Sequence, residues 1–200
     1  MEILSLPPLG ANCYVLSDSV DCVVIDPGGA PRRVMEAVSR LGGSLSAILL
    51  THGHFDHVGA AAALHAQTQA PIYIHKLDAC MIESAEGSLA LRFGFPFDPA
   101  KADKCFSDGD TISVGTMHFT VMHTPGHTAG SSCFQFYHSL FSGDTIFNGS
   151  IGNFEPQNRG TMLASVKRLC SLAPETIVYP GHESKTTIGA FTSFWGSGIY

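Results

Sequence analysis

The sequence has few charged residues, and they are spread along the chain. Charged residues make up 14% of its 200 residues, and the formal net charge is −6. No block of lysines or arginines occurs, although clustered basic side chains are what hold a phosphate backbone. We therefore expect no nucleic-acid partner.

Long apolar runs and paired cysteine motifs are also absent. No apolar run reaches the roughly 18 residues that a membrane span needs, and Met1–Ser5 lacks the basic start of a signal peptide. Without a Cys-x-x-Cys pair, the sequence does not suggest zinc bound through thiolates. We interpret the cysteines as mostly buried thiols in a reducing compartment, the cytoplasm. They are Cys13, Cys22, Cys80, Cys105, Cys133 and Cys170.

What the chain does have is glycine, at 21 residues, and a hydrophobic content of 44%, a mixture typical of many strands and turns. Extended apolar segments alternate with helical ones, which predicts a layered α/β fold in one domain over residues 1–200. Residues 76–104 are expected to be an irregular connection, whose stretch Phe93–Phe97 either packs or walls a pocket. Strands are expected at 2–6, 12–17, 20–25, 45–50, 71–75, 111–114, 117–122, 132–137, 139–141 and 176–179. Helices are expected from Pro31 to Leu41, directly behind His57, over 161–172, and around Ile188, Phe191 and Trp195.

The densest group of metal-binding side chains is Thr51-His52-Gly53-His54-Phe55-Asp56-His57. It directly follows the apolar run Leu45–Leu50, which is expected to be a buried strand. Packing would explain one histidine, but three histidines with a carboxylate among them are typical of a metal or catalytic site.

A histidine or aspartate also follows three later apolar strands. These residues are His127, Asp144 and His182, and each comes directly after a glycine. Ligand sites in α/β folds collect at strand ends, so residues far apart in sequence can meet there. Together with the first cluster, these residues predict one metal centre assembled from distant parts of the chain.

The order of these motifs resembles the metallo-β-lactamase-fold hydrolases, and within them glyoxalase II, the hydroxyacylglutathione hydrolases. Only eighteen residues follow His182, so the chain resembles a short form that lacks the C-terminal helical domain of the longer enzymes. The segments that carry the resemblance are Asn12–Tyr14, Ile25–Gly28, Leu50–His57, Thr124–Thr128, Ser142–Phe147 and Pro180–His182.

The resemblance implies an αβ/βα sandwich, with two mixed sheets, helices on the outer faces and two metal ions at one edge. Imidazole and carboxylate ligands suit zinc best, and also iron or manganese. The implied ligands are His52, His54 and His127 for the first ion, Asp56, His57 and His182 for the second, and Asp144 as the bridge.

The reaction that this resemblance implies is hydrolysis of a thioester, an S-(2-hydroxyacyl)glutathione. We expect a hydroxide that bridges the two metals to attack the carbonyl carbon, with Asp56 and Asp144 as catalytic ligands. The Asp56 carboxylate would orient the hydroxide or accept its proton. Asp26 is expected to support a metal-bound histidine through a hydrogen bond, and a turn-forming role before Pro27 explains it equally well.

Substrate contacts are expected from Arg159, Lys185 and Phe147. Many relatives carry Arg-Thr/Ser-Asp-Phe where this chain has Asn153-Phe154-Glu155, so a positive charge near the pocket is missing. Arg159 and Lys185 lie close to the motif loops in sequence and would replace it. Ordinary surface charge is the competing explanation for both.

Several alternatives share these motifs. A persulfide dioxygenase would hold one iron through His52, His127 and Asp144, and a lactonase or esterase makes similar demands on the site. From a different class, the chain would be a metal-binding scaffold without activity. The partner is expected to be a small-molecule thioester, with neither nucleic acid nor membrane. The apolar tail is expected to pack on the domain, with a homodimer contact as the alternative.

Overall fold

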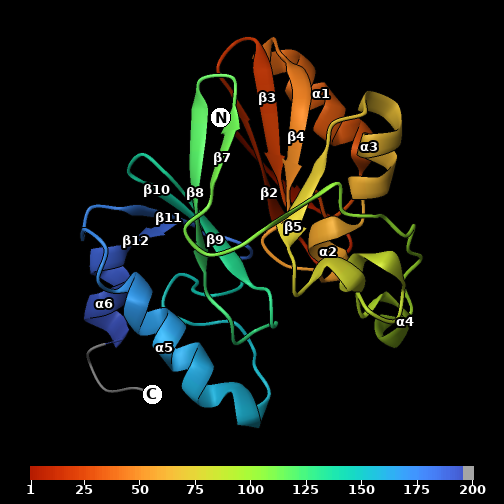
Figure 1. The fold of residues 1–200 in the computed structure, drawn as a ribbon. Coiled ribbons are helices and arrows are strands. Elements are labelled where there is room, and N and C mark those ends of the chain that lie inside the picture. Colours follow the sequence, from red (N-terminus) through yellow and green to blue (C-terminus); the bar gives the residue numbers. More distant parts are fainter. Residues whose placement is uncertain (196–200) are drawn as a thin grey trace.

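Two six-stranded mixed sheets lie face to face, with helices on both outer sides (Figure 1). The structure is a computed structural model that describes residues 1–195. The arrangement is the αβ/βα sandwich that the sequence predicts.

The first sheet is built by the N-terminal half of the chain. Its strands pair antiparallel from β1 to β3 and parallel from β3 to β6. In spatial order, which is also sequence order, they are β1 (Glu2–Leu6), β2 (Ala11–Ser17), β3 (Asp21–Ile25), β4 (Ser44–Leu49), β5 (Ile72–His75) and β6 (Lys104–Phe106).

The second sheet is built by the C-terminal half and is antiparallel except for the β10–β11 pair. Its spatial order is β12-β11-β10-β9-β8-β7. The strands are β7 (Thr111–Val114), β8 (Met117–His123), β9 (Ser132–Phe136), β10 (Ser139–Gly143), β11 (Ile177–Pro180) and β12 (Thr186–Thr187).

Helices cover the outer face of each sheet. Figure 1 shows α1 (Pro31–Leu41) and α3 (Ala61–Thr68) beside the first sheet, and α5 (Arg159–Leu169) and α6 (Ile188–Trp195) beside the second. Between them in sequence lie the short helices α2 (Phe55–Val58) and α4 (Ala90–Phe93) and the 3-10 helices η1 (Ala79–Glu83) and η2 (Pro156–Asn158).

The core accordingly has three layers, and strand burial follows from them. One apolar cluster lies under α1 and α3, one between the sheets, and one under α5 and α6. β3 is buried at almost every residue because both of its faces are covered, as expected for a strand of a parallel sheet. β7 alternates exposed and buried residues, since one of its faces meets solvent.

The predicted elements are all present, and the structure adds several short elements that were not predicted. The alanine-rich helix predicted behind the metal motif is α3, while α2, which begins at Phe55 inside the motif, was not predicted. The connection 76–104 contains η1 and α4 and ends in the short strand β6 at Lys104, and β12 was not predicted either. Short strands such as β6 and β12 form because they pair with the neighbouring strands β5 and β11, and the local sequence pattern does not reveal that pairing.

Cysteine burial also differs from the prediction. Cys80 and Cys105 are exposed and Cys170 is half-buried, so only three of the six thiols are buried, and all six are free. The apolar tail packs as predicted through Ile188 and Phe191, while residues 196–200 lie outside the described residues. Within residues 1–195, no helix combines the length and the apolar character that a membrane span requires.

Candidate metal centre

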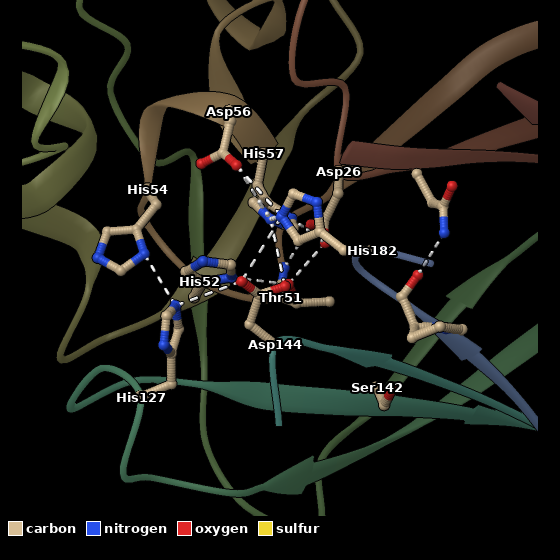
Figure 2. A network of polar contacts seen from close by, with 12 residues as sticks. Asp26, Thr51, His52, His54, Asp56, His57, His127, Ser142, Asp144 and His182 are labelled. Atoms are coloured by element: carbon tan, nitrogen blue, oxygen red, sulfur yellow. Dashed lines mark hydrogen bonds and ion pairs between the residues drawn. The ribbon is translucent and has the colours of Figure 1, made fainter. Parts of the chain in front are cut away.

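The predicted ligands meet where the strands of both sheets end (Figure 2). The predicted ligands form two groups, and within each group the candidate ligand atoms lie within 4.8 Å of one another. The first contains His52, His54 and His127, and the second contains Asp56, His57 and His182.

In the first group, three imidazole rings face one another. The Nε2 atom of His127 lies 2.9 Å from the Nδ1 atom of His54. The ring of His52 lies 4.7 Å from that of His54 and 4.8 Å from that of His127, centre to centre. This grouping brings the His127 loop, between β8 and β9, against the segment that follows β4.

In the second group, an aspartate and two histidines converge. The Nε2 atom of His182 lies 3.3 Å from the Oδ2 atom of Asp56 and 3.3 Å from the Nε2 atom of His57. His182 comes from the loop after β11, so this group again joins the two sheets.

Asp144 lies between the two groups (Figure 2). Its Oδ1 atom is 3.3 Å from the Nε2 atom of His57, and its Oδ2 atom is 3.5 Å from the Nε2 atom of His127. The same Oδ2 atom is 3.7 Å from the Nε2 atom of His182. One carboxylate therefore reaches histidines of both groups, the position that a bridging ligand needs.

Glycine makes two of these approaches possible. A Cβ atom on Gly181 would overlap Oδ1 of Asp144 and press on the His57 ring, and a Cβ atom on Gly28 would overlap the carbonyl oxygen of Asp56. Side chains at these positions would separate the ligands, which explains why a glycine precedes His182 and follows the Asp26 turn.

Asp26 supports the second group from behind. Its Oδ2 atom lies 3.0 Å from the Nδ1 atom of His57, and its carboxylate accepts hydrogen bonds from the Thr51 backbone N–H and hydroxyl. This contact directs the Nε2 atom of His57 toward the site. Asp26 is also in a turn, with φ at 52°, so the two roles proposed for it coexist.

Other contacts fix the remaining rings. The Nδ1 atom of His127 lies 2.6 Å from the Asn153 carbonyl oxygen, so that nitrogen donates and Nε2 faces the site. The loop of His182 is held by β2, since Asn12 and Tyr14 both donate to the Pro180 carbonyl oxygen. These contacts give a structural reason for the Asn12–Tyr14 segment of the sequence resemblance.

The protonation of the site suits a cation. Burial and the neighbouring imidazoles lower the pKa of His52 far below its usual range and that of His54 to about 3, so both are neutral. Burial opposes a charge on His57, but Asp144, Asp26 and Asp56 outweigh it and raise its pKa to about 10. The site therefore has a negative potential, which a metal ion would satisfy as well as a proton does.

Two buried atoms lack hydrogen-bond partners within the described part of the chain, and both are candidate ligand atoms. They are Nε2 of His52 and Oδ1 of Asp144. An unpaired buried polar atom costs about 1–3 kcal/mol, and a coordinate bond removes that cost. Since imidazole and carboxylate are ligands that divalent ions take, the residues fit a pair of such ions.

A cavity of about 460 Å³ opens over the ligands. Its lining includes Phe147, as the sequence predicts, but neither Arg159 nor Lys185, which are exposed elsewhere. The predicted wall formed by Phe93–Phe97 is present only in part: Phe93 lines the cavity, while Phe95 stacks on Phe55. The full lining comprises Leu9, His54, Phe55, Asp56, Leu89, Arg92, Phe93, His127, Asp144, Phe147, Asn153, Phe154, Glu155 and His182.

Arg92 is a charged lining residue that the sequence did not predict. It lies in α4, within the segment expected to be irregular, and no motif marks it. The two arginine ion pairs within residues 1–195 involve Arg40 and Arg168, so the guanidinium of Arg92 is available to a ligand. Arg92 and Glu155 give the cavity one arginine and one carboxylate outside the candidate metal ligands.

A family model supports the same assignment as the site. The model of the metallo-beta-lactamase superfamily matches residues 6–182, nearly the whole chain. The chain belongs to this superfamily. Two curated relatives are a hydroxyacylglutathione hydrolase, GloC, of Haemophilus influenzae and a probable metallo-hydrolase, YqgX, of Bacillus subtilis. They are 34% and 32% identical over 94% and 90% of this chain, and over 93% and 89% of their own length.

Solved structures of superfamily members share the fold. The B3 metallo-beta-lactamase BLEG-1 superposes with a TM-score of 0.89 at 34% identity, and TTHA1623, solved in a di-iron-bound form, with 0.83 at 36%. These matches cover 96% and 95% of this chain and 96% of each neighbour. ETHE1 from Myxococcus xanthus superposes at 0.79 with 27% identity, over 96% of this chain and 82% of its own.

Proposed function

We propose that this superfamily member is a binuclear metallohydrolase that cleaves thioesters, with S-(2-hydroxyacyl)glutathione as its substrate. The observation that carries the proposal is the pair of ligand groups, joined by Asp144, each of which contributes residues to the lining of one cavity. A relative named hydroxyacylglutathione hydrolase, 34% identical over 94% of the chain, supports the choice of substrate.

The first ion would be held by His52, His54 and His127, the second by Asp56, His57 and His182, with Asp144 between them. Two divalent ions bound there would supply Lewis acidity, which lowers the pKa of water to near neutrality and polarises a carbonyl. We favour zinc because all ligands are imidazole or carboxylate, with iron and manganese as alternatives. The di-iron form of TTHA1623, at 36% identity, supports both the count of two and the iron alternative.

The chain's own residues perform the remaining tasks. Burial raises the pKa of Asp56, but the His182 hydrogen bond and the neighbouring imidazoles outweigh it and lower the pKa to about 2, so this carboxylate is ionised and able to orient a water. Phe55, Phe93 and Phe147 form an apolar wall that excludes water around the acyl group. A thiolate leaves readily because thiols have pKa values of about 8.5.

Arg92 and Glu155 match the charges of a zwitterionic carrier. Glutathione carries carboxylates and an ammonium group, and the cavity lining offers a guanidinium and a carboxylate to pair with them. We therefore propose Arg92, and not Arg159 or Lys185, as the residue that contacts the carboxylate of the carrier.

A second candidate is hydrolysis of a cyclic amide, since the similar structure of BLEG-1 is that of a B3 metallo-beta-lactamase. A persulfide dioxygenase with one iron would need only His52, His127 and Asp144. The convergence of Asp56, His57 and His182 into a second group favours two ions instead.

The test is a substrate panel on protein of known metal content. S-lactoylglutathione, a neutral thioester, a lactone, a β-lactam and a persulfide with oxygen-uptake recording would be compared at equal enzyme concentration. We expect two metal ions per chain and the highest kcat/KM with S-lactoylglutathione. Oxygen uptake with one iron, or preference for the β-lactam, would contradict the proposal.

A further inference from the structure

Asp78 is a fully buried carboxylate that is not one of the candidate ligands. It follows β5, in the segment 76–104 that was expected to be an irregular connection. Three donors surround it: the Gly53 N–H at 3.2 Å, the Thr128 hydroxyl at 2.6 Å and the Gly130 N–H at 2.6 Å. A carboxylate so enclosed fixes the groups that donate to it, because each would lose a buried hydrogen bond by moving away.

The donors belong to the two segments that carry the first ligand group. Gly53 lies between His52 and His54, and Thr128 directly follows His127. Gly130 must be a glycine for this contact, since a Cβ atom there would lie 2.6 Å from Oδ1 of Asp78. One side chain therefore joins the segment after β4 to the loop between β8 and β9.

The second ligand group has a different support. Asp26 contacts His57 directly, and the segment of His182 is held by Asn12 and Tyr14. Within residues 1–195, no hydrogen bond or ion pair joins Asp78 to Asp56, His57 or His182. Asp26 also reaches the first group, through the Thr51 hydroxyl that lies 3.1 Å from Nδ1 of His52, whereas the contacts of Asp78 lie only on the segments of the first group.

We propose that Asp78 is a positioning residue that sets the metal affinity of the first group, His52, His54 and His127, without affecting the second. This inference rests on the ligand assignment of the proposed function. Residues that orient metal ligands typically change metal affinity by about 10–100-fold when they are replaced. We expect a loss of that size at the first position and none at the second.

The test measures Zn²⁺ affinity of the full chain in two backgrounds. His182→Ala weakens the second group and leaves the first intact, and His54→Ala does the reverse. Asp78→Ala, Asp78→Asn and Thr128→Val are each added to both backgrounds, and Zn²⁺ binding is titrated by calorimetry and chelator competition. Ser132→Ala is the matched control, since its hydroxyl bonds the Gly130 carbonyl oxygen in the same loop without touching Asp78.

Asp78→Ala should reduce Zn²⁺ affinity at least tenfold in the His182→Ala background and less than twofold in the His54→Ala background. Thr128→Val and Asp78→Asn keep part of the contacts and should give smaller losses with the same selectivity. If thermal melting shows that Asp78→Ala is unfolded, the Thr128→Val and Asp78→Asn variants test the proposal without it. Equal losses in both backgrounds, or none in the His182→Ala background, would overturn the proposal. Failure of the wild type to hydrolyse thioesters would refute the proposed function and leave this result standing.

Discussion

Replacing Arg92 by glutamine would remove a guanidinium from the cavity lining and leave the candidate ligands in place. If Arg92 pairs with a carboxylate of the thiol carrier, the variant should bind the transition state of an anionic substrate less well. A neutral thioester, such as an acyl-N-acetylcysteamine, should react at its former rate. The two substrates share the acyl thioester and differ in the carrier, which is charged in glutathione and neutral and smaller in N-acetylcysteamine.

The size of the effect follows from the exposure of Arg92. Two opposite unit charges 4 Å apart attract by about 1 kcal/mol in water and by about 4 kcal/mol at an effective dielectric constant of about 20. Arg92 is exposed at the cavity, so the lower end applies. A loss of about 1 kcal/mol is about a fivefold fall in kcat/KM.

The assay is steady-state hydrolysis of S-lactoylglutathione and of the neutral thioester at low and high salt. We expect about a fivefold fall for the glutathione substrate, reduced by salt, and less than a twofold change for the neutral one. Arg159→Gln and Lys185→Gln are matched controls outside the cavity and should leave both rates unchanged. Equal losses on both substrates, or a larger loss from either control, would refute the assignment.

Three further outcomes are expected. His54→Ala should abolish activity and weaken metal retention while circular dichroism shows an intact fold; full activity would refute its role as a ligand. Tyr14→Phe should lower the free energy of unfolding in urea by about 1 kcal/mol, because it removes the buried hydroxyl that donates to Pro180; an unchanged midpoint would contradict this. The pKa of Asp18 is lowered by hydrogen bonds from the Thr116 backbone, the Asp21 backbone and the Thr116 hydroxyl. Its stabilisation should therefore be present above pH 4 and be lost as the pH falls toward the lowered value. The stability gap between wild type and Asp18→Asn should close over that range, and a gap that is constant with pH would contradict it.

The convergence of the candidate ligands was predictable because the chain marks these residues locally. Four lie within six consecutive positions, 52–57, and His127, Asp144 and His182 each follow a glycine near a strand end. Strand ends of layered folds meet at one edge, so the pattern also predicted that these residues would come together.

Arg92 and Asp78 could not be found in this way. Both lie in the connection 76–104, whose course depends on β6 pairing with β5 and on η1 and α4 packing near the motif. A single arginine or aspartate in such a segment has no spacing that distinguishes it from a surface charge. The opposite error arose at Arg159 and Lys185, which are close to the motif loops in sequence but do not line the cavity.

The measurement that tests the binuclear hydrolase most directly is a metal titration of the metal-free protein, with the rate of S-lactoylglutathione hydrolysis recorded at each step. We expect two equivalents to bind and the rate to reach its maximum only as the second equivalent is taken up. Maximal hydrolysis at one equivalent, or two bound equivalents without thioester hydrolysis, would contradict the proposed function.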